Sequence, residues 1–572
     1  MLKYSEYKYK RIDLDAFKNK AKHLIENFNS LSSVEQQIKY IKKLEQIMGE
    51  WSTYASIASL EYSRDTFSKK NKEENEFYDN IQPEMQEIST QYADAILKSP
   101  FRSKLEKEYG VHIFNLKEIE RKTFKPKIKN LLRKESDLCN KYTELISSAQ
   151  IDFRGNSYNL TGLGSFHSDA DRATRRESYK ARFNFFEENS DKLDSIYDEL
   201  VKVRTKIAHD LGYKNYIELG YNKLSRTDYD DRDVAAFRQQ IIDHVVPVTT
   251  KLNNQRKKIL ELDHLYFYDS INFKEGDPKP KGSIDHLISE AQIMYRELSN
   301  ETGNFFDMMV NEELMDLENR KGKAGGGFCT AFPIYERPYI FANFNGTDHD
   351  VTVLTHEAGH AFQVYSSRNQ PLQEYYWPTL EACEIHSMSM EFITWPWMDK
   401  FFKEETDRFK YLHMAKSLSF LPYGACVDHF QHWVYENYNA TSQERKEQWL
   451  RLEKIYLPNR DYGDINYPKK GGIWQGQLHI YQMPFYYIDY TLAQTCAFQF
   501  WDKFNKDRKH AWKEYFNLCK VGGSMPFTKL LNVANLKSPF KDGTLQEVVS
   551  EISMWLDSIN VENLTLENND KL

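Results

Sequence analysis

The strongest constraint on this chain is the pentapeptide His356-Glu357-Ala358-Gly359-His360. Residues at positions i and i+4 share one face of an α-helix, so two imidazoles at this spacing can bind one metal ion when the segment is helical. The apolar stripe of this helix lies on the side opposite both histidines, which favours a zinc site over a structural pair. The stripe consists of Val351, Leu354, Ala358 and Phe362.

Glu357 lies about 100° around the helix from the first histidine, so its carboxylate can reach a zinc-bound water without being a ligand. We therefore predict that Glu357 is a general base. Catalytic zinc commonly has three protein ligands, and the residues alone leave four candidates for the third: Glu374, Glu381, Glu384 and Glu391. Glu384 and Glu391 are seven residues apart in a predicted helix from Thr379 to Ile393, which suits one ligand and one partner for an imidazole.

The surroundings of the pentapeptide are also predictable. We expect Thr347 or Asp348 to cap the start of its helix, and Gly359 to keep space clear beside the site. A glycine-rich loop, Lys321 to Thr330, precedes an extended segment, Tyr339 to Phe344, whose aromatic and β-branched content indicates an edge strand.

Composition limits the class of protein. The chain has 572 residues, 28% of them charged, with 24 Gly and 17 Pro, which is typical of a helical globular protein. A net charge of −7 gives no field that would attract nucleic acid or an anionic membrane. The first residues lack the apolar core of a signal peptide, no apolar run is long enough for a bilayer, and the six cysteines show no paired spacing. We expect a cytoplasmic protein with free thiols.

The pattern along the chain divides it into regions. Residues 1–200 predict successive amphipathic helices, interrupted near 149–160 by a short β-hairpin about the Gly155-Asn156 turn. Ser33 and Gln36 have the spacing of a capping box at the start of one of these helices. Residues 201–560 form the predicted catalytic region, and 561–572 are a polar tail.

Four long stretches carry a family resemblance: KAGGGFCT, FANFNGTDHDVTVLTHEAGHAFQVYSS, LEACEIHSMSMEF and QLHIYQMPFYYIDYTLAQ. In them the chain resembles the thimet oligopeptidase and oligoendopeptidase F family of zinc peptidases, especially the bacterial Pz-peptidase-like oligoendopeptidases. The resemblance implies a mainly α, two-lobed zincin of the gluzincin type. It also implies a small β-sheet beside the active-site helix, a deep substrate channel, and one bound Zn²⁺.

The resemblance also implies roles for individual residues. Glu384 begins the E-x-x-S-x-x-x-E pattern and becomes the third zinc ligand beside His356 and His360. Tyr490 is the preferred donor to the developing oxyanion, followed by Tyr487 and His479. The predicted substrate-binding residues are Tyr486, Phe344 and Gly346. The predicted edge strand would pair with the backbone of the peptide substrate.

Together these features predict an oligoendopeptidase that cuts internal bonds of oligopeptides. One rival is an exopeptidase or another zinc amidase on the same helix, although an aminopeptidase would need an acidic G-x-M-E-N anchor that the chain lacks. The other rival is a helical binding or scaffold protein whose pentapeptide is incidental. It predicts no stoichiometric zinc.

Overall fold

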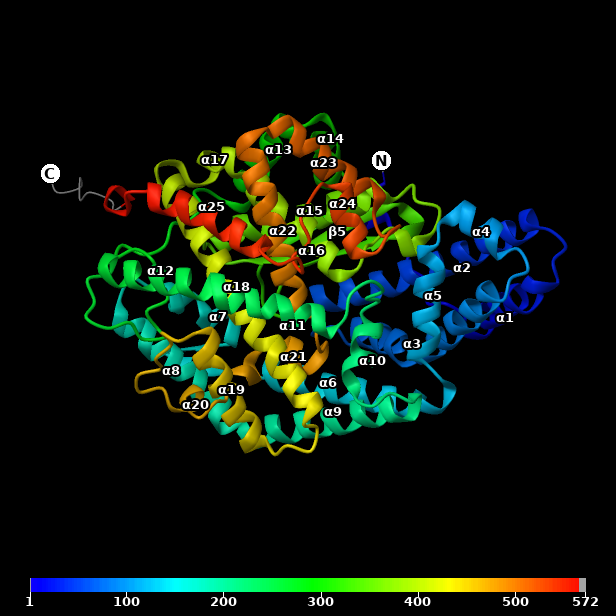
Figure 1. Cartoon of the computed structure of the whole chain (residues 1–572), viewed down its shortest axis with the longest axis horizontal. Coiled ribbons are helices and arrows are strands. Elements are labelled where there is room, and N and C mark those ends of the chain that lie inside the picture. Colours follow the sequence, from blue (N-terminus) through cyan, green and yellow to red (C-terminus); the bar gives the residue numbers. More distant parts are fainter. Residues whose placement is uncertain (1, 565–572) are drawn as a thin grey trace.

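The computed structural model describes residues 2–564, and most of them are helical, as the mainly α prediction requires. The first five helices form a projection at one end of the molecule (Figure 1). They are α1 (Leu14–Asn27), α2 (Val34–Arg64), α3 (Lys69–Leu97), α4 (Arg102–Tyr109) and α5 (His112–Thr123). Most of their buried apolar side chains form a core of their own, which Leu372 and Tyr375 join, whereas Ile57 and Leu60 of α2 belong to the main core.

A second group of helices lies mostly in the lower half of Figure 1 and packs into the main core. It comprises α6 (Lys129–Ser147), α7 (Leu160–Gly164), α8 (Arg172–Glu188), α9 (Ser190–Leu211), α10 (Tyr216–Lys223), α11 (Asp231–Gln240) and α12 (Val246–Ile259). The predicted hairpin is present, because β1 (Ile151–Phe153) pairs antiparallel with β2 (Asn156–Tyr158). The division at residue 200 stays a prediction. Of the predicted polar tail, residues 565–572 lie outside the described residues.

Three strands follow α13 (Ile284–Leu298) and α14 (Asn300–Asn311), in the spatial order β3-β5-β4. β5 (Arg337–Phe344) pairs parallel with β3 (Met315–Glu318) and antiparallel with β4 (Phe328–Phe332). The prediction that residues 339–344 form an edge strand is therefore wrong. Their aromatic and β-branched side chains reflect burial in the centre of the sheet, whereas β3 and β4 are the two edge strands, and β4 begins inside the predicted glycine loop.

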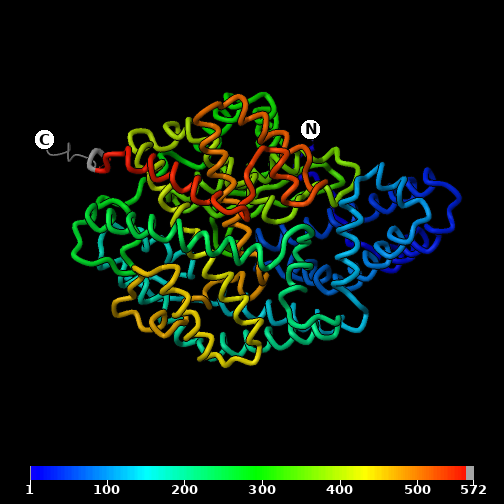
Figure 2. Tube along the Cα trace, viewed as in Figure 1, coloured from blue at the N-terminus to red at the C-terminus, as the bar shows by residue number. Residues whose placement is uncertain are grey.

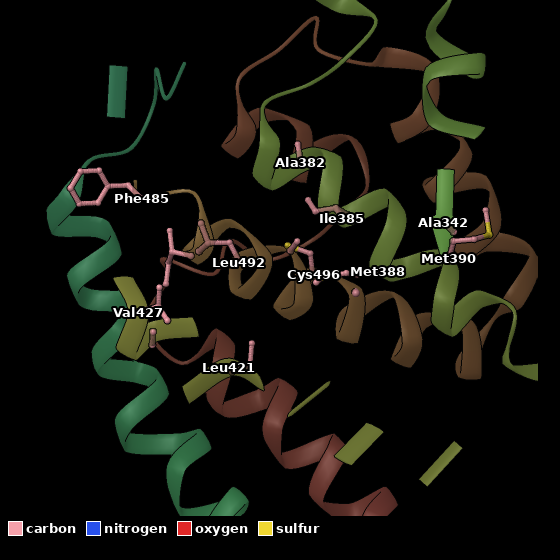
Figure 3. Close-up of a cluster of buried hydrophobic side chains, with 14 of the residues drawn as sticks. Ala342, Ala382, Ile385, Met388, Met390, Leu421, Val427, Phe485, Leu492 and Cys496 are labelled. Carbon is pink, nitrogen blue, oxygen red and sulfur yellow. The ribbon is translucent and has the colours of Figure 1, made fainter. Parts of the chain in front are cut away.

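Three helices that pack on one another and on the sheet come from the last two fifths of the chain (Figure 2). α15 (His349–Ser367) packs on β4 and β5, and α16 (Leu380–Ile393) lies between α15 and α22 (Tyr487–Lys506). Figure 3 shows apolar side chains of α16 and α22 that are buried together, among them Ile385, Met388 and Leu492. The remaining helices are α17 (Asp399–Phe402), α18 (Thr406–Glu436), α19 (Ser442–Tyr456), α20 (Asn466–Lys469), α21 (Leu478–Gln482), α23 (Arg508–Val521), α24 (Phe527–Val533) and α25 (Thr544–Ser558).

Two predicted helix caps differ from the structure in detail. Ser33 caps α2 by accepting from the Gln36 backbone N–H, but the Gln36 side chain accepts from Ser32, so only half of the capping box forms. Asp348 occupies the N-cap position of α15 without a capping hydrogen bond. Its carboxylate pairs with Lys416 at 2.9 Å instead, because a cation from α18 lies within reach.

Candidate metal centre

The close approach of α15 and α16 depends on Gly359. A Cβ at this position would lie 2.6 Å from the carbonyl oxygen of His386 and 2.7 Å from Cα of Ser387, both on α16. The space that the sequence predicts beside Gly359 is therefore filled by the backbone of the neighbouring helix. This contact brings the acidic residues of α16 to the histidines of α15.

Three side chains meet where the two helices cross. Oε2 of Glu384 lies 3.2 Å from Nε2 of His356 and 3.4 Å from Nε2 of His360. One ligand atom from each residue falls within 4.8 Å of the other two, as the coordination shell of one ion requires. Burial alone would raise the pKa of Glu384, yet the two imidazoles hold that pKa well below its usual range. Two nitrogens and one oxygen are donors suited to a divalent transition metal.

Glu357 is buried beside this set, at 6% exposure, and its Oε2 has no hydrogen-bond partner among residues 2–564. Burial raises the pKa of its carboxyl group. A Cβ on Gly327 would lie 3.3 Å from Oε1 of Glu357, so the glycine just before β4 leaves room for this carboxylate. An unsatisfied buried acceptor in a native structure is a marker of function.

A relay of side chains orients His356 from behind. Nδ1 of His356 lies 2.7 Å from one oxygen of Glu391, and the other oxygen lies 2.7 Å from Nε2 of His413. Nδ1 of His413 accepts from the Trp395 indole N–H at 3.0 Å. Because an indole only donates, His413 keeps its own proton on Nε2 and donates it to Glu391. Glu391 can then accept the Nδ1 proton of His356, which leaves Nε2 of His356 free to bind a metal.

His413 and Trp395 were not found from the sequence. Neither belongs to a local motif: His413 lies in the long helix α18, and Trp395 is in a single turn after α16. Only the partner role predicted for Glu391 indicates that a further side chain is needed on its second oxygen.

The predicted histidine and tyrosines gather on the other side of Glu384. The Tyr486 hydroxyl donates to Oε1 of Glu384 at 2.7 Å, and the Tyr490 hydroxyl lies 3.4 Å from Nε2 of His479. The Tyr487 ring packs edge-on against both His479, at 5.0 Å between centroids, and Tyr490, at 5.6 Å. Burial lowers the pKa of His479 to about 4, which keeps it neutral.

Other predicted residues lie away from this group. The Phe344 side chain is buried in the core, and the Gly346 backbone N–H donates to Asp350 at 2.7 Å. Glu381 is buried and accepts from Thr379 at 3.0 Å. Cys383, which precedes Glu384 directly, is buried as well, with its thiol 3.3 Å from the Pro378 carbonyl oxygen.

Glu374, the remaining candidate ligand, belongs to a separate group of charges, here named the Lys117 cluster. Nζ of Lys117 lies 2.8 Å from Glu374 and 3.0 Å from Glu120, with the lysine side chain only 4% exposed. Glu45 completes the cluster through a side-chain hydrogen bond to Glu374.

Two cavities flank the centre. One, of about 560 Å³, is bordered by His356, Glu391, His479 and Tyr490. The other, of about 720 Å³, runs between the N-terminal helices and Trp377, whose ring lies 6.5 Å from that of His360. A larger cavity of about 940 Å³ is lined by the N-terminal segment and β3 and contains none of the site residues, so size alone does not locate the chemistry.

Comparison with known proteins decides the family. The model of peptidase family M3 matches residues 165–550, and that of the peptidase M3 N-terminal domain matches 4–124. The chain belongs to peptidase family M3. It is therefore a metallopeptidase with a metal cofactor and peptide substrates.

Relatives agree along the whole chain. A solved structure of Pz peptidase A with an inhibitor superposes with a TM-score of 0.96 at 48% identity, covering 98% of this chain and 100% of the other. An oligoendopeptidase F homolog of Borreliella burgdorferi is 22% identical, covering 91% of this chain and 90% of the relative. Oligopeptidase PepF of Bacillus subtilis is 20% identical, covering 87% and 76%. Within residues 2–564, no helix has the length and apolar character needed to cross a bilayer.

Proposed function

We propose that this M3 peptidase is a zinc-dependent oligoendopeptidase that hydrolyses internal bonds of short peptides. The observation that carries the proposal is the convergence of His356, His360 and Glu384 beside a buried carboxylate without a partner. Two histidines and one glutamate are a common ligand set of catalytic zinc. When bound, zinc supplies a Lewis acid that polarises the scissile carbonyl and lowers the pKa of water.

The side chains of the protein would divide the remaining work. Glu357 would accept a proton from the attacking water and pass it to the leaving amine, as its free Oε2 allows. The Tyr490 hydroxyl would donate a hydrogen bond to the carbonyl oxygen as that oxygen gains negative charge, with His479 and Tyr487 holding the phenol in place. Tyr486 would bind substrate beside Glu384.

The surrounding structure suits an extended peptide. β4 is one of the two edge strands of its sheet and begins directly after Gly327, which lies beside Glu357, so its outer edge is a candidate partner for the peptide backbone. The roles given to Phe344 and Gly346 remain predictions. Cavities on both sides of the centre would receive residues before and after the cleaved bond. We also propose a cytoplasmic location, supported by six free cysteines.

The test is mass-spectrometric mapping of cleavage sites in oligopeptides with blocked and with free ends. Internal cuts that disappear on chelation and return with zinc are the expected result. Cuts confined to the ends would indicate an exopeptidase. Absence of cutting by protein that contains one zinc per chain would contradict the proposed activity.

A further inference from the structure

The turn that leads into α22 has an unusual backbone. Phe485 has φ of +68°, in the left-handed region, and its side chain is fully buried. For a bulky residue other than glycine this conformation is energetically unfavourable. Such a conformation persists only where the surroundings hold it in place, and it is most frequent at functional sites.

Contacts from two other helices and one loop hold this turn. Nη2 of Arg226 donates to the Phe485 carbonyl oxygen at 2.7 Å, and Oε1 of Gln431 accepts from the Phe485 backbone N–H at 3.1 Å. The ring of Phe485 fits against Gly220 of α10, where a Cβ would lie 2.6 Å from it. Backbone and ring are thus fixed independently.

Arg226 is itself fixed by several further contacts. Its side chain is fully buried, and Nη2 also lies 2.5 Å from Oδ1 of Asp489, in the first turn of α22. The guanidinium lies over the Tyr221 ring at 4.4 Å and interacts electrostatically with Glu381, three residues before Glu384 on α16. One side chain therefore links the connection after α10, the turn at Phe485 and the start of α22.

Tyr486 follows Phe485 directly, so the direction of the turn sets the direction of this tyrosine. Its hydroxyl donates to Oε1 of Glu384 at 2.7 Å, and its ring lies 4.9 Å from that of Tyr490. A change in the backbone at Phe485 would move both contacts.

We propose that Arg226 is a positioning residue for catalysis, which holds the strained turn at Phe485 and thereby fixes Tyr486 against Glu384 and the Tyr490 ring. The inference rests on the proposed peptidase function. Arg226 touches neither the proposed zinc ligands nor the cavity beside them, so its effect would pass through the turn.

The first test is Arg226→Lys, assayed with an internally quenched peptide that the wild-type protein cleaves. Both bonds come from Nη2, and a lysine lacks the planar guanidinium that fixes the position of this nitrogen and lies over the Tyr221 ring. Since small displacements of reacting groups can cost about 100-fold, we expect kcat to fall about tenfold with KM nearly unchanged and one zinc per chain retained. Arg175→Lys is the matched control, because Arg175 is also buried and binds both a carbonyl, that of Tyr268, and an aspartate, Asp269. It should keep the wild-type kcat.

Two further variants separate positioning from general stability. If Arg226 acts through Tyr486, the double variant Arg226→Lys/Tyr486→Phe has the same kcat as Tyr486→Phe alone. Gly220→Ala presses on the Phe485 ring while leaving Arg226 intact, and alanine is a better helix former than glycine. It should lower kcat, with KM again nearly unchanged.

The outcomes are distinct. A wild-type protein that cleaves no peptide refutes the proposed function itself. Cleavage by the wild type with an unchanged kcat in Arg226→Lys, or with losses that multiply in the double variant, refutes the positioning role alone. A failure of both Arg226→Lys and Gly220→Ala to fold would also refute it, because the arginine would then serve the fold.

Discussion

Two buried groups of charged side chains invite comparison: the metal centre at the crossing of α15 and α16, and the Lys117 cluster between α5 and the segment before α16. In the Lys117 cluster, the ammonium group lies between two carboxylates, so each carboxylate has a cationic partner. At the proposed metal centre, two imidazoles and one carboxylate converge, and Oε2 of the buried Glu357 has no hydrogen-bond partner among residues 2–564. Convergent ligand atoms beside an unpaired carboxylate favour a metal-dependent reaction, whereas the ion pairs of Lys117 stabilise a contact between segments.

The largest expected effect is a loss of peptidase activity on substitution at the proposed metal centre but not in the Lys117 cluster. Glu357→Gln should lower kcat by about 1,000-fold or more, because the base is lost while the ligands stay in place. Zinc content, measured by mass spectrometry of the metal, should remain at one ion per chain. Glu374→Gln is the control from the Lys117 cluster and should keep its activity. Substantial turnover by zinc-loaded Glu357→Gln would show that Glu357 is not the general base.

A change in the Lys117 cluster should lower the stability of the protein and leave the proposed metal centre unaffected. Lys117→Met leaves the half-buried Glu374 and Glu120 without their cation, which should lower the free energy of unfolding by about 1–3 kcal/mol. Denaturant unfolding followed by fluorescence measures this change. Zinc affinity should be unaffected. A large loss of zinc in this variant would contradict the separation of the Lys117 cluster from the proposed metal centre.

The relay behind His356 should affect metal affinity to an intermediate degree. Glu391→Gln is expected to weaken zinc binding by about 10-fold to 100-fold, since partners that orient a ligand contribute on that scale. Competition with a coloured chelator gives the dissociation constant. His413→Gln should weaken binding less, because it acts through Glu391. An effect of His413→Gln greater than that of Glu391→Gln would contradict this order.

The smallest effect concerns pH. Burial, reinforced by the charge of Glu374, raises the pKa of Glu45 from 4.5 to about 8. The folded state therefore holds a proton that the unfolded state releases, so stability falls as pH rises from about 5 to 8. Glu45→Gln should flatten this slope and stabilise the protein at pH 8 by about 1 kcal/mol. Thermal unfolding at a series of pH values tests the prediction, and an unchanged slope would show that Glu45 ionises normally.

Much of the centre follows from local sequence. The i, i+4 spacing and the opposite apolar stripe predicted a helix at His356 and His360, and the structure confirms that helix and its buried stripe. The seven-residue spacing of Glu384 and Glu391 predicted a shared face on one helix, and both carboxylates do lie near His356.

The remaining features depend on contacts between distant segments. The residues alone left both Glu374 and Glu384 open as the third ligand, and the structure separates them: Glu384 lies beside the two histidines, whereas Glu374 pairs with Lys117 from an N-terminal helix. A buried central strand and a half-buried edge strand can share aromatic content, which is why β5 was assigned to the wrong position. The strain at Phe485 and the bond from Arg226 have no local signal at all, because they are set by packing across 259 residues of chain.

The most direct test of the account is the zinc dissociation constant of Glu384→Gln beside that of Glu374→Gln. Loss of a ligand should weaken binding by more than about 100-fold, the upper end for residues that only orient a ligand, while Glu374→Gln binds zinc as the wild type does. Equal affinities in the two variants would contradict the assignment of His356, His360 and Glu384 as the metal site.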